Sequence, residues 1–180
     1  MTETEIKARY NKEHRGELIV WLGAHGYAPA DTEILEDTYY NHPSRDFFRT
    51  DEALRIRRIS RDGVCRAVIT YKSANRSDVG QRRDELECGV ENGETTAQIL
   101  TSLGFFPVVT VRKERTEFKK GGITFCLDSV DGLGEFFEVE VLGTEDESVP
   151  LSVFQEIAFA SPSIEKKTYF ALLLEQQEKE

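Results

Sequence analysis

Charged residues recur at every second position in several short segments, and this spacing most constrains the fold. The first segment is Glu3-Thr4-Glu5-Ile6-Lys7, in which charges alternate with smaller or apolar side chains. In a β-strand successive side chains point to opposite faces, so these charges would share one face. The same spacing recurs in four further pairs of charged residues: Arg55/Arg57, Glu85/Glu87, Lys113/Arg115 and Glu138/Glu140. We therefore expect five separate strands that each present a charged face.

The rest of the chain alternates candidate strands with fewer candidate helices. Strands are expected at residues 2–10, 36–41, 53–60, 64–73, 82–90, 108–119, 123–130 and 135–142. Helices are expected at residues 12–25, 94–103, 150–160 and 163–177, the last with Ser161 as its N-cap, and residues 175–180 are expected to fray. Strands that are mostly sequential neighbours, with helices interspersed, indicate one α+β domain over residues 1–180.

An eight-stranded antiparallel β-barrel would remove the exposed edges of such a sheet and enclose the charged faces. Strand parity would then point these acids inward: Glu3, Glu5, Glu85, Glu87, Asp128, Glu138 and Glu140. It would also point these bases inward: Lys7, Arg55, Arg57, Lys72, Arg83, Lys113 and Arg115. Buried charges are tolerated when they are paired or bind ions, and here the two signs balance. The pattern favours a tunnel with a charged lumen and about four flanking helices; the alternative for each pair is a solvated strand face with cross-strand salt bridges.

Composition excludes several classes of function. The net charge of −10 weighs against binding of extended nucleic acid, which needs a surplus of basic residues. No apolar run is long enough to cross a bilayer, so we expect a cytoplasmic protein with no membrane partner. Neither the cysteines nor the histidines have the spacing of a zinc site, and the thiols are expected to be free or buried; these residues are Cys65, Cys88, Cys126, His14, His25 and His42.

The inward charges point to a particular chemistry. Carboxylates without His or Cys partners select hard cations such as Mg²⁺ or Mn²⁺. Arg and Lys side chains suit phosphate oxygens. Gly132-Leu133-Gly134 lacks the context of a phosphate-binding loop and is interpreted as a hairpin turn. The sequence therefore predicts side-chain binding of a metal-chelated polyphosphate.

At this point the chain resembles the CYTH superfamily, the triphosphate tunnel metalloenzymes that include class IV adenylyl cyclase and thiamine triphosphatase. The resemblance spans nearly the whole chain and rests on motifs in the expected order: Glu3-Thr4-Glu5-Ile6-Lys7, Asp37-Thr38-Tyr39-Tyr40, Leu54-Arg55-Ile56-Arg57, Thr70-Tyr71-Lys72, Arg83-Asp84-Glu85-Leu86-Glu87, Lys113-Glu114-Arg115, Leu127-Asp128-Ser129-Val130 and Gly132 to Glu140. It implies an eight-stranded barrel whose lumen binds a triphosphate with a divalent metal, Mg²⁺ or Mn²⁺. A homodimer is expected by the same analogy.

The resemblance also implies roles for single residues. The metal would be held directly or through water by Glu3, Glu5, Asp128, Glu138 and Glu140, with Glu85 and Glu87 as supporting carboxylates. The triphosphate would be bound by Lys7, Arg55, Arg57, Lys72, Lys113 and Arg115, and we group Arg83 with them as a further lumen base. A late basic residue of the family corresponds to Lys166 or Lys167. Lys7 is our candidate for catalytic proton transfer, provided that its neighbours lower its pKa.

The segment from Lys113 to Glu140, with its Lys-Glu-Arg, glycine turn, Leu-Asp and Gly-Leu-Gly-Glu-Phe, most resembles the class IV cyclase branch, which converts ATP into cyclic AMP and pyrophosphate. Two departures leave this open: Ser73 stands where a glycine often follows the lysine, and Glu140 adds a carboxylate that some cyclases lack. The alternative is hydrolysis of the terminal phosphate of tripolyphosphate, thiamine triphosphate or a nucleoside triphosphate. A third hypothesis is a noncatalytic module that binds a polyphosphate or nucleotide.

Overall fold

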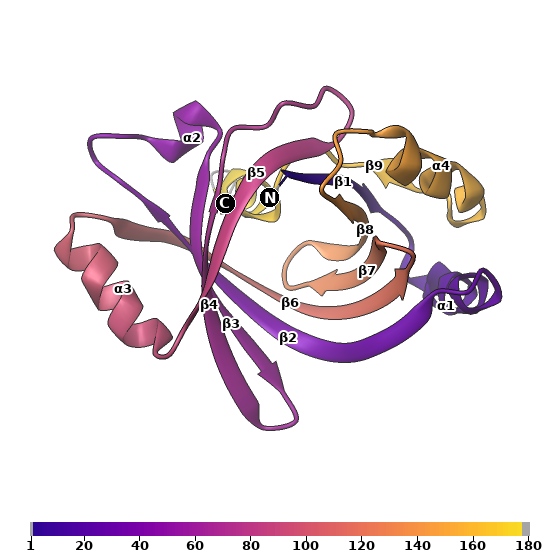
Figure 1. The fold of residues 1–180 in the computed structure, drawn as a ribbon, viewed down its shortest axis with the longest axis horizontal. Coiled ribbons are helices and arrows are strands. Elements are labelled where there is room, and N and C mark those ends of the chain that lie inside the picture. The colour runs from indigo at the N-terminus through magenta and orange to yellow at the C-terminus, as the bar shows by residue number, and fades with distance from the viewer. Residues whose placement is uncertain (1, 178–180) are drawn as a thin grey trace.

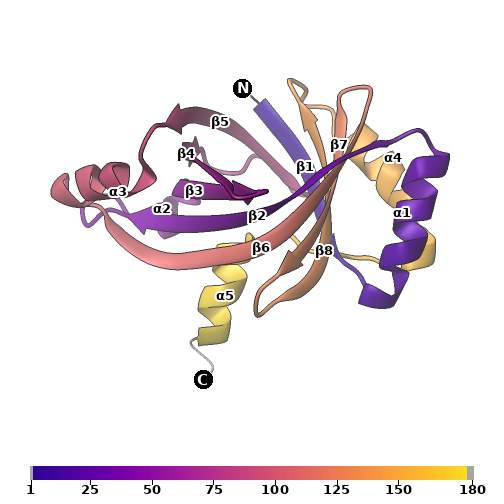
Figure 2. The same cartoon turned by 90° about the horizontal axis from the view of Figure 1, so that it is seen from below.

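Eight antiparallel strands of the described chain, residues 2–177 of the computed structural model, close into a barrel (Figures 1 and 2). The strands are β1 (Thr2–Arg9), β2 (Ala28–Asn41), β3 (Ala53–Arg61), β4 (Val64–Lys72), β5 (Gln81–Val90), β6 (Phe106–Lys120), β7 (Ile123–Val130) and β8 (Gly134–Leu142). They pair in the order β5-β4-β3-β2-β6-β7-β8-β1, and β1 also pairs with β5 to close the barrel. The expected α+β class and eight-stranded antiparallel barrel are confirmed.

The helices flank the barrel at its two ends and along one side (Figure 2). They are α1 (Arg15–Ala24), α2 (Phe47–Thr50), α3 (Gly93–Ser102), α4 (Ser148–Glu156) and α5 (Tyr169–Gln177), with short 3₁₀ turns η1 (Lys12–His14) and η2 (Ala158–Ala160). In Figure 2, α1 and α4 lie at one end of the barrel, α2 and α3 lie at the other, and α5 lies beside β6. The four expected helical regions are present, and α2 is an additional helix that we did not expect. It is a single turn, and Asp46 caps it by accepting a hydrogen bond from the backbone N–H of Phe48.

The largest apolar core lies outside the barrel. Phe125 and Phe137 point away from the lumen, stack at 5.2 Å between ring centroids, and are fully buried. Leu22 of α1 and Val153 of α4 pack into the same cluster. Burial of aromatic side chains contributes on the order of 2 kcal/mol each. The outward faces of β7 and β8 therefore supply hydrophobic stabilisation, and the inward faces are left to charged residues.

Two expected boundaries are wrong. β2 begins at Ala28 rather than at residue 36, because its first half pairs with the long strand β6 across an irregularity between Pro29 and Thr32. The expected helix over 163–177 begins only at Tyr169. Its first residues instead form a short strand, β9 (Ser163–Ile164), which pairs with the end of β1.

Ser161 does not cap that helix. It adopts φ +47° and ends η2, so the chain turns toward β1 before α5 starts. α5 includes residues 175–177, and the remaining residues of the expected frayed end, 178–180, lie outside the described residues. Among the helices of residues 2–177, none is long and apolar enough to cross a membrane.

The barrel closes through a short pairing of β1 with β5. Thr2 to Glu5 pair with Asp84 to Gln81, whereas β1 pairs with β8 along nearly its full length. Just before β5, Gly80 passes so close to β1 that an added Cβ would lie 2.2 Å from the carbonyl oxygen of Glu5. Glycine at this position therefore allows the backbone to approach the strand that carries Glu3 and Glu5.

Candidate functional site

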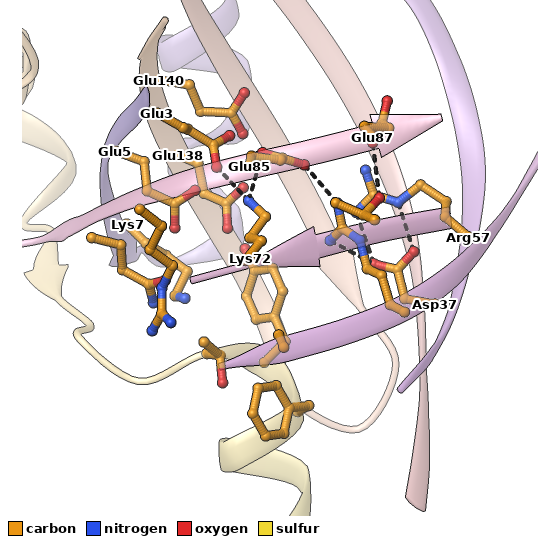
Figure 3. A pocket seen from close by; sticks show the side chains of 18 of the residues that line it. Glu3, Glu5, Lys7, Asp37, Arg57, Lys72, Glu85, Glu87, Glu138 and Glu140 are labelled. Atoms are coloured by element: carbon orange, nitrogen blue, oxygen red, sulfur yellow. Dashed lines mark hydrogen bonds and ion pairs between the residues drawn. The ribbon is translucent and has the colours of Figure 1, made fainter. Parts of the chain in front are cut away.

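The barrel encloses a cavity of about 590 Å³. Its lining includes all the predicted inward acids and bases except Asp128: Glu3, Glu5, Glu85, Glu87, Glu138, Glu140, Lys7, Arg55, Arg57, Lys72, Arg83, Lys113 and Arg115. Figure 3 labels the six glutamates, Lys7, Arg57 and Lys72 among them. The lining also includes residues that we did not assign to the site, among them Asp37, Tyr39, Thr70, Glu117, Tyr169 and Phe170. Strand parity thus identified the lumen face correctly.

Three carboxylates gather at one wall of the cavity. Glu3, Glu5 and Glu140 each place a carboxylate oxygen within 4.8 Å of the others. Antiparallel pairing brings them together, because Glu5 lies opposite Glu140 in the β1–β8 register. Three oxygen donors at this spacing suit a hard divalent cation such as Mg²⁺ or Mn²⁺. The donor set therefore fits the expected metal.

Burial, with repulsion between neighbouring carboxylates, raises the pKa of two of these acids. Burial, together with the charges of Glu138 and Glu3, raises the pKa of Glu5 to about 7. Burial also raises the pKa of Glu140 to about 8, against the opposing effect of Arg115 and with repulsion from Glu3. Both carboxyls thus resist ionisation while no cation neutralises them.

Lys72 compensates the third acid. Its ammonium contacts the Glu3 carboxylate directly and lies 3.1 Å from a carboxylate oxygen of Glu85. Burial would raise the pKa of Glu3, but Lys72 and a hydrogen bond with Glu85 outweigh it and lower the pKa to about 2. Glu3 is therefore ionised at neutral pH, ready to bind a cation.

We predict that stabilisation by Mg²⁺ grows with pH. The unfolded pKa of a Glu is about 4.5, so raised pKa values at Glu5 and Glu140 make the metal-free protein lose stability as pH rises from about 4.5 to about 8. Mg²⁺ binds the ionised carboxylates and removes this penalty. Thermal unfolding with and without Mg²⁺ should give a larger Tm increase at about pH 8.5 than at about pH 6. An Mg²⁺-induced increase that is independent of pH would contradict the prediction.

A second network joins Arg115 and Lys113 to carboxylates on the side of the barrel near α5. Arg115 donates to both carboxylate oxygens of Asp128 at 2.7 and 2.6 Å, to Glu140 at 3.0 Å, and contacts Glu138. Lys113 donates to Asp128 at 2.7 Å. These charges outweigh burial and lower the pKa of both Asp128 and Glu138. The carboxylates are thus ionised, and hold Arg115 in place.

Asp128 lies behind this network. Its side chain is fully buried, it accepts hydrogen bonds from Lys113, Arg115 and Tyr169, and it is not among the residues that line the cavity. From this position Asp128 orients the side chains of Lys113 and Arg115. Its role as a metal ligand stays a prediction.

Asp37 is a site residue that our assignment missed. Its carboxylate accepts from Arg57 at 2.6 and 2.7 Å and from Arg55 at 3.3 Å (Figure 3). Burial opposes ionisation, but Arg57 and Arg55 lower the pKa of Asp37 well below its usual range. The signal was present in Asp37-Thr38-Tyr39-Tyr40, because Asp37 shares strand parity with Tyr39, which also lines the cavity.

We predict that Asp37→Asn destabilises the protein by about 3 kcal/mol, because it removes the carboxylate that two mostly buried guanidinium groups share. Added tripolyphosphate should then raise the Tm of this variant more than that of the wild type, since the anion replaces the missing charge. The matched control is Asp31→Asn on the same strand, whose exposed pair with Arg61 contributes less than about 1 kcal/mol. Equal Tm increases in Asp37→Asn and wild type would refute the prediction.

Three predicted basic residues have other partners. Arg83 lines the cavity, but its guanidinium donates to the backbone oxygens of Ser73 and Asp51, to the Asp51 carboxylate and to Gln81. It therefore braces the segments that precede β3 and follow β4. Lys166 donates to the backbone oxygen of Asp78, Lys167 pairs with Glu175, and neither lines the cavity.

Lys7 is almost fully buried and lies opposite Glu138 in the β1–β8 register. Burial lowers its pKa, against the opposing charges of Glu138 and Glu5. This direction is the one that proton transfer by a lysine requires. Its catalytic role stays a prediction.

The comparisons with known proteins agree with this geometry. The family model described as "CYTH domain" matches residues 1–169. A Methanocaldococcus jannaschii protein named "Putative adenylate cyclase" is 37% identical over 140 residues, which cover 78% of this chain and 77% of that protein. A solved structure of a Pyrococcus horikoshii OT3 protein has a TM-score of 0.81 and 33% identity, and the match covers 97% of this chain and 99% of that one.

A structure from Hippeastrum, described as a "putative adenylyl cyclase" that reveals a dominant triphosphatase activity, has a TM-score of 0.74 with 19% identity, covering 98% of this chain and 96% of that chain. At this identity the likeness establishes a common fold only. The family model and the M. jannaschii relative establish more, since each covers well over half of the sequence. This chain is a member of the CYTH domain family.

Proposed function

We propose that this protein is a divalent-metal-dependent enzyme that acts on the phosphate chain of a triphosphate bound inside the barrel. One observation carries the proposal: a single cavity contains a cluster of three carboxylates, Glu3, Glu5 and Glu140, beside a wall of Arg and Lys side chains. Such a site neutralises the cation and the phosphates together. The family is one of adenylyl cyclase-like and triphosphatase enzymes, which supports the same assignment.

The described residues divide the work. Glu3, Glu5 and Glu140 would hold Mg²⁺ or Mn²⁺, with Glu138 beside them on β8. The bound cation would neutralise charge on the phosphate oxygens and favour displacement at phosphorus. Six bases would bind and orient the phosphate chain: Lys7, Arg55, Arg57, Lys72, Lys113 and Arg115. Arg side chains held by Asp37 and Asp128 are already oriented, which reduces the entropy lost on binding.

Our first candidate reaction is the cyclisation of ATP. The ribose 3′ oxygen would attack the α-phosphorus, and pyrophosphate would leave. The name of the M. jannaschii relative and the resemblance of the segment from Lys113 to Glu140 to the class IV cyclase branch favour this reaction. In-line attack requires the fixed phosphate positions that the basic wall offers.

Hydrolysis of the terminal phosphate is the second candidate. The cavity lining is mostly charged, which suits a phosphate chain without requiring an organic group. The Hippeastrum protein of the same fold is described as having a dominant triphosphatase activity. Water would then attack the terminal phosphorus of tripolyphosphate, thiamine triphosphate or a nucleoside triphosphate.

The test is to incubate the full chain with ATP, tripolyphosphate and thiamine triphosphate, each with Mg²⁺ and with Mn²⁺. Cyclic AMP with an equal amount of pyrophosphate supports cyclisation, and orthophosphate supports hydrolysis. Orthophosphate from ATP without cyclic AMP excludes the first candidate. If all three compounds raise the Tm but none is turned over with either metal, the protein is a binding module and the enzyme proposal fails.

Two further expectations belong to this proposal. A homodimer is expected by analogy with the family, and light scattering would give the mass of the assembly against the 20.5 kDa chain. A cytoplasmic location agrees with a substrate such as ATP, and fractionation of cells that express the protein would test it.

A further inference from the structure

Tyr169 enters the site from outside the barrel. It is the first residue of α5, which lies beside β6 (Figure 2), and its side chain is almost fully buried. Its ring packs edge-on against Phe136, with 4.9 Å between centroids. Its hydroxyl donates to a carboxylate oxygen of Asp128 at 3.0 Å. The ring is thus fixed at both its edge and its hydroxyl.

Two ammonium groups lie over this one ring. The Nζ atom of Lys7 is 4.6 Å from the ring centroid of Tyr169, and that of Lys113 is 4.7 Å away. The lysines come from β1 and β6, which are separated in the sheet by β7 and β8. Both lysines line the cavity and are almost fully buried. Tyr169, on a helix outside the barrel, thus contacts two cationic side chains from strands that do not pair with each other.

The electrostatics explain why the ring is suited to this position. Two like charges that share a poorly solvated site repel each other. The face of an aromatic ring carries negative charge and attracts a cation, more strongly where water is excluded. The hydroxyl bond to Asp128 holds the ring in register with Lys113, which donates to the same carboxylate oxygen at 2.7 Å. Tyr169 therefore offsets the repulsion without adding a second anion that would compete with phosphate.

We propose that Tyr169 is a positioning residue that holds Lys7 and Lys113 in a fixed pair for binding a triphosphate. This inference rests on the proposed function, since it assigns the pair to the phosphate chain. It makes the docking of α5 part of the anion-binding site. Packing against Phe136 alone would give Tyr169 a role in stability with no selective effect on the ligand.

The experiment compares Tyr169 with a matched tyrosine. Tyr27 is also buried, packs edge-on against Phe125 and lies under Lys120 Nζ at 5.4 Å, but it belongs to the outer core and does not line the cavity. Each tyrosine is changed to Phe and to Leu. Calorimetry measures the Kd of the nonhydrolysable imido analogue of tripolyphosphate with Mg²⁺, and steady-state kinetics separate KM from kcat on the substrate that is turned over.

We expect Tyr169→Phe to raise the Kd about threefold to tenfold, because the ring stays but loses its bond to Asp128. Tyr169→Leu should raise the Kd by about 30-fold, because it also removes the cation–π contacts. KM should rise with it while kcat changes less. Tyr27→Phe and Tyr27→Leu should change the Kd less than about twofold, although Tyr27→Leu lowers the Tm.

Contrary results are distinct from one another. An unchanged Kd in Tyr169→Phe overturns the proposal, and this variant decides the matter if Tyr169→Leu does not fold. An equal rise of the Kd in Tyr27→Leu and Tyr169→Leu also overturns it, because the effect would then reflect general loss of packing. If the wild type neither binds the analogue nor turns over any triphosphate, the proposed function fails, and the role of Tyr169 fails with it.

Discussion

Replacing Glu5 with Gln should strongly reduce metal-dependent turnover and, above pH 7, stabilise the metal-free protein. Turnover should fall on the order of 1,000-fold, because one of three clustered carboxylates is lost. The same substitution should increase stability although it lowers turnover, because the pKa of Glu5 is raised to about 7 in the folded protein. Its charge therefore destabilises the folded state as pH rises from about 4.5 to about 7, and Gln carries no charge. The gain should be on the order of 2 kcal/mol at about pH 8 and absent below about pH 4.5.

The measurements are initial rates with Mg²⁺ or Mn²⁺ and urea unfolding of the metal-free protein at both pH values. Glu114→Gln on β6 is the matched control, since Glu114 is exposed and lies outside the cavity lining. It should change neither property. Retention of more than about a tenth of the wild-type rate in Glu5→Gln would exclude Glu5 as a ligand of the essential metal.

Arg115→Met should be the most destabilising single substitution in the lumen. Arg115 is almost fully buried and is hydrogen-bonded to three carboxylates, those of Asp128, Glu138 and Glu140. Removing it leaves those charges in a poorly solvated site without their shared partner. We expect a loss of about 3–5 kcal/mol in the free energy of unfolding, together with loss of triphosphate binding.

Arg112→Met on the same strand provides the comparison. Arg112 is 57% exposed, and its pairs with Asp131 and Glu36 span 3.6 and 3.9 Å. Exposed pairs of this kind contribute about 1 kcal/mol or less. Both variants replace Arg with Met, so the difference between their free energies of unfolding in urea measures the effect of burial. Similar losses in the two would mean that the lumen network does not stabilise the barrel.

The lumen could be predicted from sequence because strand parity is a local property. Once Glu3, Glu5 and Lys7 alternate on one strand, geometry fixes that they share a face. Equal numbers of acids and bases then indicated that the faces meet, and the cavity contains them. Large apolar side chains such as those of Phe125 and Phe137 have the opposite parity, point away from the lumen and form the outer core.

Strand parity predicts whether a side chain points inward, but it does not predict whether that side chain reaches the cavity or lies behind other residues. Asp128 points inward, yet Arg115 and Lys113 lie between it and the cavity. Arg83 also points inward, yet its donors are taken by Asp51, Ser73 and Gln81. Which groups face a ligand depends on partners that are distant in sequence.

The C-terminal segment was the least predictable part of the chain. Ser161 and Pro162 have the chemistry of a helix start, but pairing of Ser163–Ile164 with β1 overrides it. That tertiary contact delays α5 until Tyr169. The same delay places Tyr169 where its hydroxyl reaches Asp128, so a wrong boundary concealed a residue of the site.

The pairing of β1 has a consequence for how the protein is made. The ribosome produces Glu3 and Glu5 long before their partner strand β8, which ends at Leu142 and carries the third carboxylate, Glu140. At about 5–20 residues per second, β1 waits on the order of ten seconds for that partner. The three-carboxylate cluster therefore cannot form on a nascent fragment that ends before Glu140, and cation capture at this cluster must follow the synthesis of β8.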